Sequence, residues 1–530
     1  MTQIDMKADV PVGAIVAFFG TDPSAQATNG WLTCDGSVLA RSAWPALFAA
    51  IGTAFGSTTG EDFCLPDLRG AFLRTLDGGS GIDPDAGSRS GSGPDGSGQG
   101  GNAIGSLQDG ATGTPAGAAA FTLSGRFSFG GSRTHGGCSD SNRIHFRDDG
   151  RDIDVTGGDA ETRPINLYAY YLIKACPNSE IDPGAGEMPV GSAMALPYDA
   201  DAVPDRPVDD YWRYCDGQDF IGAEGSTFYA LFEAIGQTSG GDDPGANQAP
   251  RFAIPDLAGA FVRGVAGART DLRFDPDRDL RRSPRPDLPI PGNAGDAVGS
   301  YEDWATAMPR KALRARLDHF PFDKTSGYQA GLATAAAFNG ATSSFPLSGG
   351  ESETRPVCMS VAWHIRFLKS GRSDRPGAYL PLGSIVASGS AVELACWQPC
   401  AGQLLLISEY KDLYRVLGNR FGGDGETTFA LPDLRGRFLR GCAARAHRQL
   451  NRGHAPVGPG EFQAAATAMP RKVFSYPVVG YPTGTHDIVD YGTGNKLLKI
   501  DGSKALALVG GDAETRPINV YVQHLIKVRG

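Results

Sequence analysis

The chain has 530 residues, 41% apolar and 20% charged, which is more than one hydrophobic core normally organises, so we expect at least two domains. Its 73 glycines and 36 prolines make up about a fifth of the chain, against roughly 12% on average, which argues against a mainly helical protein. The net charge of −10 gives no attraction to nucleic acid or an anionic membrane, and no apolar run reaches the ~18 residues of a membrane-spanning helix.

The same series of segments occurs three times, so the chain is an internal triplicate. Each copy opens with an apolar strand-like run, which begins at Pro11, Pro189 and Pro381. A tryptophan segment follows, with Trp31, Trp212 or Trp397 and, three residues later, Cys34, Cys215 or Cys400. We expect one small buried thiol in each copy.

A short helix comes next in each copy. Ser42, Ser226 and Ser408 are the predicted N-caps, and Gly52, Gly236 and Gly418 are the predicted C-terminal stops. Apolar residues at i, i+3, i+4 and i+7, such as Trp44, Leu47, Phe48 and Ile51, predict one buried stripe.

After the helix the copies read LPDLRGAFLR, IPDLAGAFVR and LPDLRGRFLR. Pro-Asp predicts a turn, and the Phe-x-Arg alternation after the glycine predicts a strand with one buried face. The aspartates of these turns, which we take as structural, are Asp67, Asp256 and Asp433. The second copy departs from the others, with Ala258 in place of Arg69 and Arg435.

Each copy closes with Glu-Thr-Arg-Pro and an apolar run, which predicts a buried strand. The recurring arginines are Arg163, Arg355 and Arg516, with Glu161, Glu353 and Glu514 two residues before them. Such a pair could grip a carboxylate or phosphate of a surface glycan, or it could lock loops within or between copies. Recurrence in all three copies favours the structural interpretation, because a receptor site needs only one.

Polar seams rich in proline and glycine divide the chain into unit 1 (1–178), unit 2 (179–372) and unit 3 (373–530). Few residues precede the first opening strand or follow the last closing run, so we expect attachment through the units or their inserts. The predicted fold is mainly β, with short helices and long loops.

The P-[VL]-G opening, the Trp-x-x-Cys-Asp-Gly segment, Leu-Pro-Asp-Leu-Arg-Gly and Glu-Thr-Arg-Pro together resemble the phage tail collar family, which includes the receptor-binding end of short tail fibres. The resemblance covers nearly the whole chain in three tandem copies, apart from variable stretches. It implies a structural component of a phage or phage-derived particle.

Two features bear on assembly. Short tail fibres are trimers that often hold an axial metal with His-x-His, but none of the eight histidines here stands in that pattern, so we predict no metal and no cofactor. Three fused units can pack about one axis without the loss of translational freedom that separate molecules suffer. We therefore expect an intrachain pseudo-trimer, with one chain per pseudo-trimer.

The variable stretches are candidate binding regions, because loops on a repeated scaffold concentrate functional residues. We expect the glycine-rich insert at about 77–118 to be extended or mobile. The Pro/Arg-rich insert at about 265–297 could dock an acidic partner or form a solvated face. In unit 3, Tyr476, Tyr481 and Tyr491 are candidates for sugar stacking; packing of the loop is the other interpretation.

Three functions stay open at this point. The favoured one is an adhesin at a tail fibre or spike tip that binds a bacterial surface glycan. The second is an architectural collar or baseplate adaptor that binds other particle proteins, and the third is a polysaccharide depolymerase. No nucleophile elbow, zinc-helix or phosphate-loop motif occurs, which favours a non-catalytic protein. We expect a virion protein, made in the bacterial cytoplasm and extracellular after release, without a nucleic-acid partner or membrane insertion.

Overall fold

The computed structural model describes residues 10–112, 162–176, 188–197, 211–307, 350–368, 380–441 and 515–529, apart from 165, 246–247, 259, 272–274, 284–287, 357, 389, 391–395 and 518. It also describes short strands at 119–120, 152–154, 313–316, 343–346, 462–463, 466–468, 475–478 and 505–510. Strands dominate and the helices are short, which confirms the mainly β prediction.

Each unit is built on an antiparallel pair between its first and last strands. In unit 1, β1 (Ala14–Phe18) pairs with β10 (Asn166–Lys174). The same pairing joins β12 (Ser192–Leu196) to β22 (Cys358–Arg366) in unit 2, and β23 (Ile385–Ser388) to β32 (Asn519–Lys527) in unit 3. The tryptophan strands β2 (Trp31–Thr33), β13 (Trp212–Tyr214) and β24 (Trp397–Pro399) lie along the closing strands.

The predicted helices are present as α1 (Pro45–Ile51), α2 (Tyr229–Ile235) and α3 (Lys411–Leu417). Their leucines Leu47, Leu231 and Leu413 are buried as the apolar stripe predicts, and Gly52, Gly236 and Gly418 end the helices with positive φ. The serine caps are wrong. Each helix begins two residues later than predicted, after Trp44, Phe228 or Tyr410, without a side-chain cap. In unit 2, the Ser226 hydroxyl instead donates to the Ile221 carbonyl.

The opening strands of the three units pair with one another around a common centre. Ala17 lies opposite Ala193, Ala195 opposite Ile385, and Ala14 opposite Ser388. Every residue of these strands is buried. A strand buried on both faces reads as a continuous apolar run, which explains the opening sequences.

The motif strands, β5 (Phe72–Thr75), β17 (Phe261–Gly264) and β27 (Phe438–Gly441), exchange partners between units. The closing strand of unit 1 pairs in parallel with β17 of unit 2, that of unit 2 with β27 of unit 3, and that of unit 3 with β5 of unit 1. The registers are equivalent, because Asn166 lies opposite Phe261, Cys358 opposite Phe438 and Asn519 opposite Phe72. The three units thus form a closed cycle of strand pairs.

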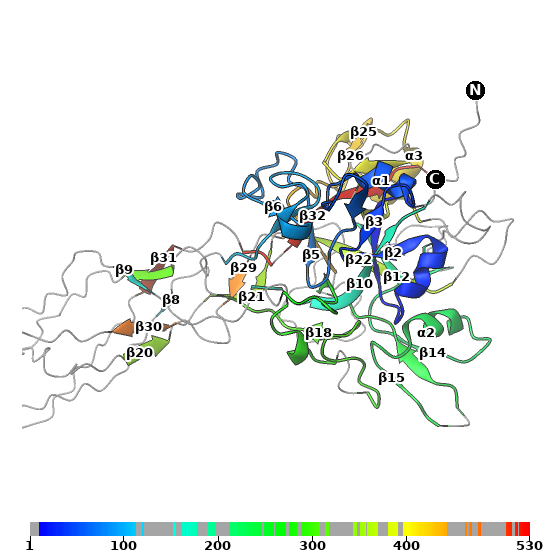
Figure 1. The fold of residues 1–530 in the computed structure, drawn as a ribbon, viewed down its shortest axis with the longest axis horizontal. Coiled ribbons are helices and arrows are strands. Elements are labelled where there is room, and N and C mark those ends of the chain that lie inside the picture. The colour runs from blue at the N-terminus through cyan, green and yellow to red at the C-terminus, as the bar shows by residue number, and fades with distance from the viewer. Residues whose placement is uncertain are drawn as a thin grey trace, which may run out of the picture.

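Three further hairpin sheets lie beside the helices in the head of the molecule (Figure 1). They comprise β3 (Val38–Ala40) with β4 (Asp62–Cys64), β14 (Asp219–Ile221) with β16 (Arg251–Ala253) and β15 (Gly241–Asp242), and β25 (Leu404–Leu406) with β26 (Thr428–Ala430).

The inserts add strands on the opposite side from the helices (Figure 1). Close to the head, β6 (Ser90–Gly91) and β7 (Ser106–Gln108) join the closing strand of unit 3, while β18 (Tyr301–Glu302) and β28 (Phe462–Gln463) join those of units 1 and 2. The remaining strands are β8 (Ala119–Ala120), β9 (Asp152–Asp154), β19 (Leu313–Arg316), β20 (Ser343–Pro346), β21 (Gly350–Arg355), β29 (Ala466–Ala468), β30 (Ser475–Val478) and β31 (Ala505–Gly510).

Residues 77–112 of the glycine-rich insert are not extended, contrary to expectation. They fold back onto unit 1, with Asp83 and Arg89 buried. Glycine serves close packing here: a Cβ at Gly93 would lie 2.4 Å from the Phe55 carbonyl oxygen, and one at Gly105 would lie 2.4 Å from that of Ala54. The Pro/Arg-rich insert of unit 2 does not form the solvated face that was one of its two interpretations, because Asp275 and Arg281 are buried.

Candidate functional site

The last residue of each Phe-x-Arg motif is an arginine that crosses into the preceding unit of the cycle. Arg74, Arg263 and Arg440 are almost completely buried. Their guanidinium carbons lie 5.2 Å from the ring centroid of Phe438, 5.1 Å from that of Phe72 and 5.6 Å from that of Phe261, respectively. Each arginine therefore stacks on a phenylalanine of another unit, in the same cyclic order as the strand pairs.

The three phenylalanines, Phe72, Phe261 and Phe438, form one buried cluster with Cys358. Phe-x-Arg predicted a strand with one buried face, but the function of the arginine was missed. The signal was available: an arginine at the same position of three copies, two residues after a core phenylalanine, indicates a buried cation that stacks on a ring.

Carboxylates of the inserts lie beside two of these buried charges, Glu302 beside Arg263 and Asp83 beside Arg74. Arg263 Nη1 lies 3.2 Å from Glu302 Oε2 and donates to the Tyr168 hydroxyl at 2.9 Å. Arg263 Nε donates to the Gly70 carbonyl of unit 1. Asp275, which is ion-paired with Arg281, also approaches Arg263. In unit 1 the corresponding Arg74 donates to Gln108 Oε1 at 3.0 Å and to the Gly436 carbonyl of unit 3.

The arginines of Glu-Thr-Arg-Pro also reach across unit boundaries. Arg163 of unit 1 contacts Asp277 at 2.8 Å and Glu302 at 3.1 Å, both of unit 2. Arg516 of unit 3 contacts Asp85 of unit 1 at 2.8 Å. Arg355 lies in β21, where its backbone pairs with Ala466 of unit 3. Glu161 and Glu514 lie outside the described residues, so the pairing of each arginine with the glutamate of its own motif stays a prediction.

The threonine before each of these arginines takes part in a recurring hydroxyl pair. Thr162 contacts Thr112, Thr354 contacts Thr306, and Thr515 contacts Thr467. All six side chains are buried. Thr162 also accepts a hydrogen bond from the Ala307 backbone of unit 2. These pairs satisfy hydroxyl groups that would be costly to bury alone, and they mark the junction between the head and the inserts.

Each turn aspartate is held within its own turn, and Asp67 also contacts Arg269 of unit 2 at 3.2 Å. Asp67 and Asp433 each form a two-bonded ion pair with the arginine two residues later, Arg69 or Arg435. The Arg435 guanidinium lowers the pKa of Asp433 below its ordinary value. In unit 2, which has Ala258 instead, Asp256 accepts from the Ala258 backbone N–H. These contacts hold the turn.

The same turns explain one glycine of the tryptophan segment. Gly36, Gly217 and Gly402 have φ of +80°, +78° and +74°. An added Cβ would lie 3.1 to 3.2 Å from the Cβ of the turn aspartate. Cys34, Cys215 and Cys400, just before, are buried as predicted, and burial raises the pKa of each thiol well above its ordinary value.

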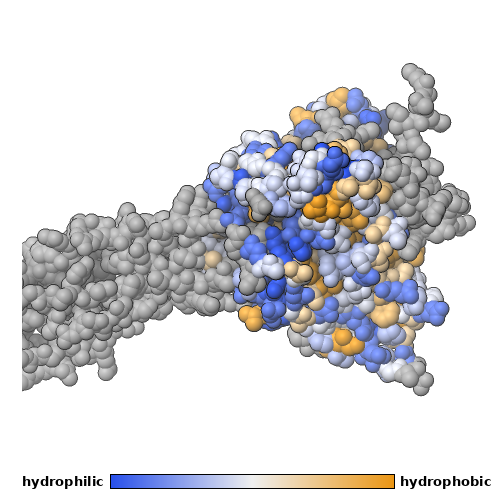
Figure 2. Space-filling view, in the orientation of Figure 1, coloured by the Kyte–Doolittle hydropathy of each residue, from blue (hydrophilic) through white to orange (hydrophobic). Residues whose placement is uncertain are grey.

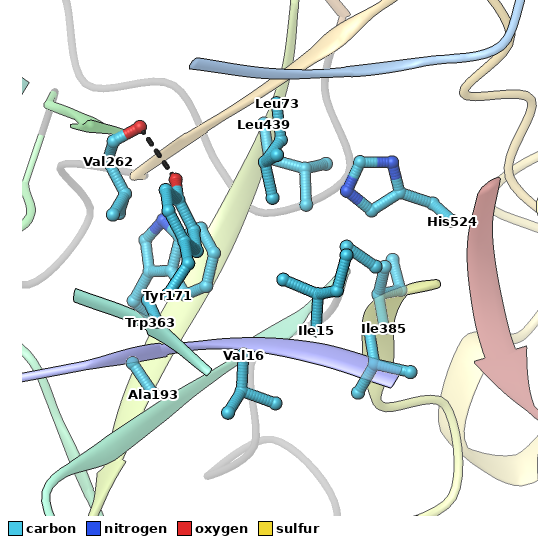
Figure 3. A pocket seen from close by; sticks show the side chains of 13 residues that line it. Ile15, Val16, Leu73, Tyr171, Ala193, Val262, Trp363, Ile385, Leu439 and His524 are labelled. Atoms are coloured by element: carbon cyan, nitrogen blue, oxygen red, sulfur yellow. Dashed lines mark hydrogen bonds between the residues drawn. The ribbon is translucent and has the colours of Figure 1, made fainter. Parts of the chain in front are cut away.

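A small cavity lies where the three units meet (Figure 3). Its volume is about 40 Å³, enough for a water molecule but not for a sugar. Equivalent positions of the three units line it: Ile15, Ala193 and Ile385; Leu73, Val262 and Leu439; Tyr171, Trp363 and His524. The last set differs in every unit, whereas three identical chains would place the same residue at each of these positions.

Two polar groups at this cavity are satisfied by neighbours. The Tyr171 hydroxyl donates to the Val262 carbonyl at 3.0 Å. His524 Nδ1 lies 2.7 Å from the Thr75 hydroxyl, and burial lowers the pKa of His524 to about 3. The imidazole is therefore neutral at physiological pH.

Among the described residues, no group of three His, Cys, Asp or Glu side chains is placed to hold a metal ion. Within the same residues, no helix is both long and apolar enough to cross a membrane. Tyr476 lies in β30, where its backbone pairs with Phe345 of unit 2; Tyr481 and Tyr491 lie outside the described residues. The glycan-contact prediction therefore stays a prediction.

Residues 13–73 and 383–439 match the family described as Phage Tail Collar Domain. The chain carries two phage tail collar domains. They coincide with the opening strand, helix and motif strand of units 1 and 3, and the corresponding part of unit 2 is outside the matched segments. The collar domain is a structural domain of phage tail fibres, so it implies a virion component.

The chain is also similar to Protein RhiB of Rhizobium leguminosarum bv. viciae, with 46% identity over 61 residues. The match covers 11% of this chain and 28% of RhiB. It therefore supports a shared segment and does not extend to the whole of either protein.

Proposed function

We propose that the chain is an adhesin of a phage or phage-derived tail, in which three collar-like units form an intrachain pseudo-trimer and the inserts bind a bacterial surface glycan. The observation that carries this proposal is the closed cycle of strand pairs. Three closing strands meet three motif strands of other units in equivalent registers, which is the arrangement expected when fused units replace separate subunits.

Fusion has a physical advantage for such an assembly. Linking the units raises their effective concentration to roughly the millimolar range, and the buried arginines then join units that are already held together. Separating one junction would break the stacking of Arg263 on Phe72 and its hydrogen bond to the Gly70 carbonyl, which both join units 1 and 2. The result is a rigid support for loops.

The inserts are the proposed ligand-binding end. The sheet β8, β31, β19 and β9 takes strands from units 1, 3, 2 and 1, in that order. A second sheet joins β20 of unit 2 to β30 of unit 3. These sheets lie on the side away from α1, α2 and α3 (Figure 1). A surface to which all three units contribute, remote from the helices, suits attachment to a cell.

Binding of fluorescent purified chain to host cells tests the adhesin proposal. Periodate treatment of the cells, which cleaves sugar diols, is expected to abolish binding, whereas protease treatment is expected to leave it. The Tyr476→Ser variant is expected to bind at least tenfold more weakly, while Tyr229→Ser in α2 serves as the matched control. Binding that survives periodate and is lost with protease would refute the glycan ligand.

An architectural collar or baseplate adaptor is the second candidate. It is favoured by the same domain, which is structural and associates with other tail proteins. Purified chain that ignores host cells and glycans but binds tightly to another particle protein would support it. A depolymerase is the third candidate, and release of reducing sugars from host capsule would be its signature.

A further inference from the structure

The outer hairpin of unit 3 differs from those of units 1 and 2 in its exposed surface. Leu404 and Leu406 of β25 are 61% and 47% exposed. At the positions equivalent to these leucines, unit 1 has Val38 and Ala40, and unit 2 has Asp219 and Ile221. Only unit 3 places two large apolar side chains at alternate positions of this strand. Figure 2 shows apolar residues on the outer surface of the head, where Figure 1 places β25.

Leu405, the residue between the two exposed leucines, anchors the strand in the core. Leu405 is buried in the core of unit 3 with Leu413 and Phe429. Because side chains alternate along a strand, Leu404 and Leu406 point to the opposite face. The exposed pair is therefore presented by a fixed backbone.

The strand also has an open edge. Within the described part of the chain, β25 pairs with β26 alone. The Gln403 carbonyl accepts from the Leu431 N–H, and the Ile407 N–H donates to the Thr427 carbonyl, so these alternate residues face β26. The intervening residues face outward in an antiparallel ladder. The Leu406 carbonyl already accepts from the backbone N–H groups of Glu409 and Tyr410. The N–H and carbonyl of Leu404 and the N–H of Leu406 are left for a partner strand.

The charges near this edge define the partner further. Glu409, Asp424 and Glu426 are exposed near the Leu406 end of the strand. Two exposed cations also lie there, Lys411 and Arg529, and the Arg529 guanidinium is 4.8 Å from the Tyr410 ring. Asp424 is held as an anion, because hydrogen bonds from Thr427 and Thr428 lower its pKa. With three carboxylates against two cations, the end beside Leu406 keeps a net negative charge and favours a basic segment.

We propose that β25 is a docking edge for an extended segment of another particle protein, which adds as a strand beside Leu404 and Leu406. The segment carries apolar residues at alternate positions and lysine or arginine at the end near Leu406. Main-chain hydrogen bonds supply affinity in such strand addition, and alternate side chains supply specificity. The identity of the partner as a particle protein rests on the proposed function; the peptide-binding edge does not.

A synthetic peptide that alternates leucine and lysine is the first probe, and its glutamate counterpart is the charge control. Hydrogen exchange is followed in the full chain. The lysine peptide is expected to slow exchange of residues 404–406 at least tenfold and to leave 38–40 unchanged. Leu404→Thr with Leu406→Thr, which keeps strand-forming residues, is expected to abolish the effect. Equal slowing at both hairpins, equal slowing by the glutamate peptide, or no slowing would overturn the proposal.

Two further measurements separate the sources of a partner. If light scattering finds a concentration-dependent dimer that the double variant removes, the occupant is a second copy and the proposal is wrong. In assembled particles, the double variant is expected to be at least tenfold depleted and Val38→Thr to be retained. Normal retention of the double variant would also overturn the proposal. If wild-type chain is absent from particles although the lysine peptide binds, the docking edge stands and the proposed function fails.

Discussion

Gly441 offers a direct probe of the contact between units 2 and 3. An alanine Cβ there would lie 1.6 Å from the Leu257 carbonyl oxygen, a distance that no packed pair of atoms tolerates. The Gly441 N–H also donates to the Ala260 carbonyl at 2.8 Å. The Gly441→Ala change therefore forces the two backbones apart, rather than moving a flexible side chain.

The expected cost follows from these two effects. Overpacking of a tight interior costs about 1–3 kcal/mol, and more when backbone must move, while a lost hydrogen bond costs about 1 kcal/mol. We expect Gly441→Ala to lower the free energy of unfolding by about 3 kcal/mol or more. Gly264→Ala should behave alike, since its Cβ would lie 1.9 Å from the Leu68 carbonyl of unit 1.

Urea unfolding followed by tryptophan fluorescence measures the effect. Gly60→Ala is the matched control, because a Cβ at Gly60 has nothing within 4 Å, and we expect a change within about 0.5 kcal/mol. If Gly441→Ala and Gly264→Ala were as stable as Gly60→Ala, these glycines would not face the neighbouring units, and the interlocked arrangement would be wrong.

Three further predictions concern the core, the buried charges and pH. Leu47→Ala, Leu231→Ala and Leu413→Ala should each lower the free energy of unfolding by about 2–5 kcal/mol; smaller losses at all three would contradict the burial of the helix stripe. Arg263→Met should cost about 3–5 kcal/mol, because it leaves Glu302 buried without its partner, whereas the exposed Arg415→Met should cost less than about 1 kcal/mol. His524 has a folded pKa of about 3 below its unfolded value of ~6.5, so its contribution is complete above pH 6.5 and declines below it as the unfolded state takes up a proton. Between pH 7.5 and pH 5 the wild type should lose about 2 kcal/mol more than His524→Gln, and equal losses in urea titrations would show that the imidazole is not buried.

The repeated motifs were sufficient to predict the strands, the helix stripe and the buried cysteines. The signal was strong there because apolar periodicity reports burial directly. The serine caps failed for a local reason: Trp44, Phe228 and Tyr410 occupy the cap positions, and the intervening residues form a turn in which the Ser226 hydroxyl is a donor. Motif spacing alone could not distinguish the two geometries.

The inserts were harder to predict, because their residues fold through specific contacts that composition does not show. The glycines at 93 and 105 looked like a flexible tract, yet each allows close approach to the backbone of residues 54 and 55. Arg281 looked solvated within a charged run, yet it is buried against Asp275 and Tyr168. The composition of the two inserts gives no sign of these contacts, so it was misleading.

The exchange of strands between units was also invisible in the sequence. A closing strand such as Asn519–Lys527 has no pattern that says which motif strand it meets. Its parallel pairing with β5, more than 400 residues earlier, depends on the whole assembly. The expectation of an intrachain pseudo-trimer came from the triplication itself.

An engineered disulfide tests this arrangement most directly. Ala14 of β1 and Ser388 of β23 are opposite each other in the ladder that joins units 1 and 3, at a separation within the range of a disulfide. After mild oxidation of Ala14→Cys/Ser388→Cys, mass analysis should find a bond between positions 14 and 388 within a single chain of 55.6 kDa. Linked chains of two or three times that mass, or the absence of any bond between these positions, would contradict a closed ring of three units in one polypeptide.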